Sequence, residues 1–136
     1  MRPVLLDTNA YVSFKRKEPA TIEILQHAES IVISPIVIGE LLAGFDGGNK
    51  AQQNKIELQK FLESSRITVY PITLDTSHFF SQIYCTLKNK GKPIPTNDMW
   101  IASQALEHGC VICTLDKHFT FIEGVISGST SADLFL

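Results

Sequence analysis

Four acidic residues are the candidates for chemistry in this sequence: Asp7, Glu40, Asp98 and Asp116. Asp7 and Asp116 each come directly after a short apolar run that is typical of a buried parallel strand. Asp98 lies in the first turn of one predicted helix, and Glu40 lies in the second turn of another. In open α/β sheets the carboxyl ends of the strands and the starts of the following helices meet at one edge. We therefore expect all four acids to face one cleft.

Four carboxylates in one cleft would repel one another, raise one another's pKa values and destabilise the fold unless a cation were bound. Mg²⁺ or Mn²⁺ is the expected counter-ion, because hard cations prefer carboxylate oxygens and water. Zinc would require Cys or His ligands, and the sequence indicates none at suitable positions. Such a cation polarises a phosphoryl oxygen and activates water. Because the chain has no glycine-rich phosphate loop, we expect hydrolysis of a nucleic-acid phosphodiester rather than of a nucleotide.

The helix that carries Asp98 organises the rest of the chain. Pro95 precedes it, and Thr96 or Asn97 is the expected cap. The residues three, four and seven positions after Asp98 share its face and are apolar, two of them being alanines: Ile101, Ala102 and Ala105. This face is predicted to lie close against a sheet, with the carboxylate at its start.

Strand-like and helix-like patterns alternate along the whole chain. Predicted strands lie at residues 3–6, 31–33, 67–72 and 110–115, with at most one further short strand within 119–125. Predicted helices lie at 10–14, 20–28, from 35 to about 44–48, 49–65, from 75 or 76 to 87, and from 96 or 97 to 108. The alternation predicts βαβ units and a three-layer α/β/α sandwich with a central parallel sheet. We expect one domain at 1–126 and a C-terminal tail at 127–136 that begins as a flexible link.

Composition and charge fit one ordinary soluble domain of 136 residues. Hydrophobic residues make up 44% and charged residues 19%, which is too apolar for a disordered chain. The formal net charge of −2 neither indicates nor excludes a nucleic-acid partner. We expect no secretory signal and no membrane span, and hence a cytoplasmic protein. Three cysteines without a disulfide pattern agree with this, and Cys110 and Cys113 are expected to be buried, inert thiols.

Other notable residues are expected to have structural or solvated roles. The basic loops at 15–17 and 88–92 are expected to be solvated, with contact to RNA phosphates as the alternative. Trp100 and the aromatic residues within 79–84 are expected in the core or in a dimer contact. The histidines lack a spacing suited to a metal or a nucleophile, so surface or core positions are expected for all four: His27, His78, His108 and His118.

Four segments carry a resemblance to a known family: Leu5-Leu6-Asp7-Thr8-Asn9, Glu40-Leu41-Leu42, Asn97-Asp98-x-x-Ile101-Ala102 and Thr114-Leu115-Asp116-Lys117-x-Phe119. In order and spacing they resemble PIN-domain ribonucleases, most of all the VapC-type toxins of bacterial toxin–antitoxin pairs. The resemblance implies a Mg²⁺-dependent endoribonuclease that is usually dimeric and is neutralised by a cognate antitoxin. Asp7 and Asp98 match the main metal ligands of that family, and Asp116 and Glu40 match the acids that complete the site. Asn9 and Thr114 match polar positions beside the ligands.

Two other function classes fit part of the pattern. Phosphoaspartyl proteins, such as receiver domains and haloacid-dehalogenase-like phosphatases, also bind Mg²⁺ beside an acid that follows a first strand. The dehalogenase pattern needs a second Asp two residues after the first, where Asn9 stands here, and receiver domains need two adjacent acids near Asp7. The third class is an RNA- or protein-binding module with an inactive cleft. An idle cluster of four acids would only destabilise such a module.

Overall fold

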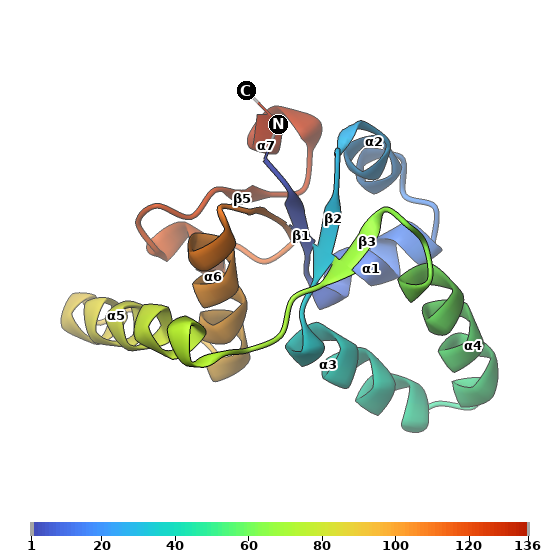
Figure 1. The fold of residues 1–136 in the computed structure, drawn as a ribbon, viewed down its shortest axis with the longest axis horizontal. Helices are drawn as coiled ribbons and strands as arrows, with labels where there is room; N and C mark the ends of the chain where they lie inside the picture. Colours follow the sequence, from blue (N-terminus) through green and yellow to red (C-terminus); the bar gives the residue numbers. More distant parts are fainter. Residues whose placement is uncertain (1, 136) are drawn as a thin grey trace.

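Five parallel strands form one sheet at the centre of the computed structural model, which describes residues 2–135 (Figure 1). The strands are β1 (Val4–Leu6), β2 (Ile31–Ile33), β3 (Ile67–Val69), β4 (Val111–Cys113) and β5 (Ser127–Gly128). Their order in the sheet is β3-β2-β1-β4-β5, and every neighbouring pair is parallel. The chain therefore adds β2 and β3 on one side of β1 and then crosses over to add β4 and β5 on the other side. That crossing makes a topological switch point between β1 and β4, where ligand sites form in sheets of this kind.

Within residues 2–135, seven α-helices and one 3-10 helix, η1, connect the strands. Their bounds are α1 (Thr8–Lys15), α2 (Pro19–His27), α3 (Pro35–Asp46), α4 (Ala51–Leu62), α5 (Leu74–Lys90), α6 (Thr96–His108), η1 (His118–Phe121) and α7 (Ser131–Phe135). Figure 1 shows α5 and α6 together on one side of the central strands, with α1, α2 and α4 on the other. The predicted α/β fold with a central parallel sheet is confirmed.

The core is built from the apolar strand runs and from one face of α6. The residues of β1, β2 and β4 are all buried, as expected for parallel strands covered on both faces. Ile101, Ala102 and Ala105 of α6 are each at most 1% exposed, so the predicted inward face of this helix is confirmed. On its other side α6 packs against α5, where the rings of Trp100 and Phe80 stack with their centroids 4.1 Å apart.

Two predicted helix caps were wrong. The N-cap of α6 is Pro95, without a side-chain capping bond, and the Asn97 amide N–H donates to Glu40. The N-cap of α5 is Thr73, which precedes the expected cap positions 75 and 76. Thr73 and Thr76 form a reciprocal capping box, so the helix starts earlier than the predicted residue 75 or 76.

The C-terminal segment also differs from the prediction. Residues 119–125 contain no strand in the structure; the strand is β5, at 127–128, within the expected flexible link. Two backbone bonds attach it to β4, from Ile112 N–H to the Ile126 carbonyl and from Thr114 N–H to the Gly128 carbonyl. The Asp133 carboxylate then accepts bonds from the backbone N–H groups of residues 129 and 130. Leu134 is 6% exposed, so this part of the tail packs against the domain, and Leu136 lies outside the described residues.

Two smaller expectations are also tested by the structure. Cys110 and Cys113 are buried, and burial raises the pKa of these thiols to about 11 and about 12, so both stay protonated at neutral pH, as expected of inert thiols. Among residues 2–135, no helix combines the length and the apolar character needed to cross a membrane.

Candidate active site

Asp7 lies at the centre of the candidate site, directly after β1. It is the N-cap of α1, and its Oδ1 accepts the Thr8 backbone N–H at 2.8 Å. Its Oδ2 accepts the Thr114 hydroxyl at 2.7 Å, across the switch point from the end of β4. The residue is 3% exposed, and burial raises its pKa from 3.8 to about 6, with the nearby charges of Asp98 and Glu40 adding to the effect. Two hydrogen bonds oppose this rise without cancelling it.

Thr114 and Asn9 join the ends of β1 and β4 around Asp7. The Thr114 hydroxyl oxygen accepts the backbone N–H of Asp116 at 3.0 Å while its proton goes to Asp7. The Asn9 side-chain oxygen accepts the Leu115 N–H at 3.0 Å, and its amide lies 3.4 Å from the Thr114 hydroxyl. The two polar residues thus hold the loop that carries Asp116 against the start of α1.

Glu40 reaches the site from α3 and bridges two helix starts. Its Oε1 accepts the Thr8 hydroxyl at 2.7 Å, and its Oε2 accepts the Asn97 amide N–H at 3.3 Å. Both partners stand beside other acids of the site, Thr8 next to Asp7 and Asn97 next to Asp98. Glu40 is therefore directed into the site rather than toward a solvated helix face.

Asp98 and Asp116 complete the acidic group on the α6 side. Asp98 is 8% exposed, and burial raises its pKa, with the charges of Asp116 and Glu40 acting in the same direction. Asp116 is more open, with 43% of its side chain exposed. The structure thus brings all four acids together, from the ends of β1 and β4, the first turn of α6 and the second turn of α3.

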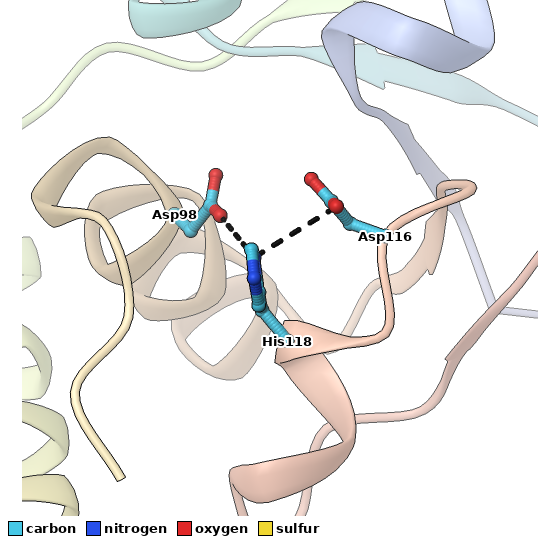
Figure 2. A group of neighbouring side chains, drawn as sticks. All are labelled: Asp98, Asp116 and His118. Atoms are coloured by element: carbon cyan, nitrogen blue, oxygen red, sulfur yellow. Dashed lines mark hydrogen bonds and ion pairs between the residues drawn. The ribbon is translucent and has the colours of Figure 1, made fainter.

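His118 is the member of the site that sequence reasoning missed. Its Nδ1 lies 3.3 Å from Asp98 Oδ2 and 3.8 Å from Asp116 Oδ1 (Figure 2). The expectation that no histidine stands where it could ligate a metal was wrong. The reason is that the chain turns into η1 at His118, which places the imidazole Nδ1 3.8 Å from the Asp116 carboxylate, two residues earlier. The only sequence signal was an Asp-x-His after a strand, which spacing rules for zinc sites do not cover.

The donor set fits a divalent cation. The ion pairs formed within residues 2–135 join none of the four acids to a lysine or arginine. Their charge is met by hydroxyl, amide and imidazole groups, which carry little or no compensating charge. Burial, together with the neighbouring carboxylates, raises the pKa values of Asp7 and Asp98. Several carboxylate oxygens near buried hydroxyl and amide groups are the surroundings that Mg²⁺ and Mn²⁺ prefer.

A sequence model of the PIN domain family matches residues 4–124, which contain every residue of this site. The chain therefore belongs to the PIN domain family. Within the family its curated relatives are VapC proteins. It is 32% identical over 127 residues to the ribonuclease VapC2 of Rickettsia felis, covering 90% of this chain and 93% of that protein. It is also 31% identical over 125 residues to the ribonuclease VapC1 of the same organism, covering 90% and 92%.

Solved structures give the same classification. VapBC2 from Rickettsia felis, bound to a DNA fragment from its promoter, matches with a TM-score of 0.83 and 28% identity, covering 93% of this chain and 97% of the other. VapBC-1 from nontypeable Haemophilus influenzae matches with a TM-score of 0.81 and 26% identity, covering 93% and 96%. The resemblance read from the sequence, a PIN-domain protein of the VapC type, is confirmed.

Proposed function

We propose that this chain is a divalent-metal-dependent endoribonuclease and the toxin of a toxin–antitoxin pair. The observation that carries the proposal is the convergence of four acids at the switch point of the sheet, in a chain whose curated relatives are named ribonucleases. The substrate is RNA, cut within the strand by hydrolysis of a phosphodiester bond that leaves a 3′-hydroxyl and a 5′-phosphate.

The four acids would share the work of holding Mg²⁺ or Mn²⁺. Asp7 and Asp98 would be the main ligands, and Glu40 and Asp116 would complete the site directly or through water. A cation of this kind supplies polarisation of the phosphoryl oxygen and a water of lowered pKa. The raised pKa values of Asp7 and Asp98 support this assignment, because a bound cation would stabilise both carboxylates in their charged form.

Asn9 and Thr114 would position the ligands rather than bind the cation. Thr114 donates to Asp7 and accepts from the Asp116 backbone, so one hydroxyl sets the relative position of two acids. Asn9 holds the adjoining loop through Leu115. Partners of this kind, which orient metal ligands, commonly change metal affinity by about 10–100-fold when they are mutated.

The phosphoaspartyl alternative is disfavoured by the surroundings of Asp7. A nucleophilic carboxylate needs a free oxygen that faces the phosphorus atom. Both Asp7 oxygens accept hydrogen bonds, one from the Thr8 N–H and one from the Thr114 hydroxyl, and the residue is 3% exposed. This geometry suits a carboxylate that is held in place as a metal ligand better than a carboxylate that attacks phosphorus.

The proposed partners are an antitoxin and a second copy of the chain. Solved relatives are VapBC complexes, and a cognate antitoxin would insert a segment into the acidic cleft or cover a groove beside it. A homodimer is proposed from the family resemblance. The stacked rings of Phe80 and Trp100, with the half-exposed Tyr84 beside them, form a candidate contact surface for it. We place the protein in the cytoplasm, together with its RNA substrate.

The proposal is tested by RNA cleavage with the purified protein. Cleavage should require Mg²⁺ or Mn²⁺, stop in EDTA and disappear in Asp7→Asn and Asp98→Asn. The matched control is Asp75→Asn, which neutralises an exposed acid in the first turn of α5 and should leave cleavage unchanged. Cleavage in EDTA, or activity above a few per cent in either site variant, would contradict the assigned roles.

A further inference from the structure

One edge of the candidate site differs in its chemistry from the rest. On most of the site the donors are oxygens, but at this edge the Nδ1 of His118 faces two carboxylates. One oxygen of Asp98, one of Asp116 and this nitrogen all lie within 4.8 Å of one another. Figure 2 shows the three side chains converging from the start of α6, the loop after β4 and the start of η1.

The imidazole is held in this position by its own helix. Phe119, the next residue, is fully buried and anchors η1 in the core. The Thr120 hydroxyl donates to the Lys117 carbonyl at 2.6 Å and closes the turn. Asp98 is fixed by α6, whereas the side chains of Asp116 and His118 are 43% and 44% exposed. The group is therefore well positioned on the protein side and open to ions on the solvent side.

The distances between the His118 nitrogen and the two carboxylate oxygens suit a cation that takes nitrogen as a ligand. Zinc binds imidazole nitrogen and carboxylate oxygen at about 2.0–2.2 Å, so neighbouring ligands of one ion lie roughly 3–3.6 Å apart. The two nitrogen-to-oxygen distances here, 3.3 Å and 3.8 Å, need only small side-chain rotations to meet this requirement. An imidazole ligand also shifts preference from Mg²⁺ toward later first-row metals, because Mg²⁺ strongly prefers oxygen.

We propose that Asp98, Asp116 and His118 form a cation position for Zn²⁺ or a metal of similar preference, with one nitrogen and two oxygen ligands. It adjoins the all-oxygen position of Asp7 and Glu40 and shares Asp98 with it. The proposal deepens the function proposed above and rests on it in treating Asp98 and Asp116 as metal ligands. Three protein ligands leave room for water at the fourth place, as in open zinc sites.

The direct test observes the imidazole nitrogen itself. The protein is labelled with ¹⁵N-histidine on a Cys85→Ser background, because the exposed Cys85 thiol would compete for zinc. On titration with Zn²⁺, the Nδ1 resonance of one of the four histidines should shift to the range of metal-bound nitrogen. The shift should be absent in His118→Gln and retained in His27→Gln, whose ring contacts its own helix α2.

Calorimetry separates a ligand from a residue that merely orients Asp98. If His118 is a ligand, His118→Gln should weaken Zn²⁺ binding at least about tenfold and leave Mg²⁺ affinity within about twofold, since Mg²⁺ does not use the nitrogen. An equal loss for both metals, or Mg²⁺ binding without a zinc-dependent shift of the His118 nitrogen, would overturn this inference and leave the proposed function standing. Failure to bind either metal would overturn both.

Discussion

Replacing Asp7 by Asn should stabilise the metal-free protein at neutral pH. Asp7 is 3% exposed, and burial is the main reason that its pKa rises from 3.8 to about 6. This shift corresponds to about 3 kcal/mol of folding free energy lost while the carboxylate is charged, because one pKa unit is about 1.36 kcal/mol. Asn has nearly the same shape, carries no charge and keeps an oxygen for the Thr8 N–H. Its amide N–H can donate to the Thr114 oxygen, because the Thr114 hydroxyl can turn to the Asn9 side-chain oxygen, which lies 3.5 Å away. Most of the loss should therefore be recovered.

The stability gained by Asp7→Asn should decrease as the pH is lowered. Because the pKa of Asp7 is raised in the folded state, the folded protein binds the proton more tightly than the unfolded chain does. Lowering the pH through about 6 therefore relieves the parent's loss of stability, and the relief is complete below the unfolded value of 3.8. Asn does not titrate. The stability difference between variant and parent should fall from about 3 kcal/mol at pH 7 to roughly half of that at pH 5.

The assay is urea unfolding in EDTA at pH 7 and pH 5. Asp75→Asn is the control, since it neutralises an exposed acid at a helix start and should lower stability by at most about 1 kcal/mol. Mg²⁺ should stabilise the parent and reduce the advantage of Asp7→Asn. An Asp7→Asn protein that is less stable than the parent at pH 7 in EDTA would contradict this prediction, as would an equal stability difference at both pH values.

Three further predictions concern the supports of the site and the fold. Thr114→Val, which keeps the shape but removes the bonding hydroxyl, should lower the free energy of unfolding by about 1–3 kcal/mol in urea titrations; no change would contradict its role. Gly128→Ala should destabilise by about 1–3 kcal/mol, because its Cβ would overlap Asp133, whereas Gly44→Ala, with open space around it, should not destabilise. Alkylation of the native protein, read by mass spectrometry, should modify Cys85 alone, and rapid modification of either buried thiol would contradict the described packing.

Much of the fold followed from local patterns in the sequence. The apolar runs that became β1, β2 and β4 are buried on both faces, so hydrophobicity alone marks them. β5 could not be found in this way, since two residues, Ser127 and Gly128, are held at the sheet edge by backbone bonds rather than by apolar side chains. The bond from the Asn97 amide to Glu40 could not be found from local patterns either, since the two residues are 57 positions apart in sequence.

The residues of the candidate site also include some that could be predicted from the sequence and one that could not. The grouping of Asp7, Asp98 and Asp116 was predictable because strand ends and helix starts meet at one sheet edge. His118 was not predictable, because its approach to Asp98 depends on the turn of η1 and on the burial of Phe119. Sequence spacing predicts contacts between residues that helices and strands bring together. A contact that depends on an irregular turn can be found only from the structure.

The most direct test of the central claim is whether the acids together bind a divalent cation. Thermal unfolding is measured in EDTA and in millimolar Mg²⁺ or Mn²⁺, for the parent and for Asp98→Asn. Binding to the folded state alone adds RT ln(1 + [L]/Kd), about 2.7 kcal/mol when the metal is at about 100 times Kd. We predict a clear metal-dependent rise in the melting temperature of the parent and a much smaller rise in the variant. Equal melting temperatures with and without metal in the parent would contradict the account.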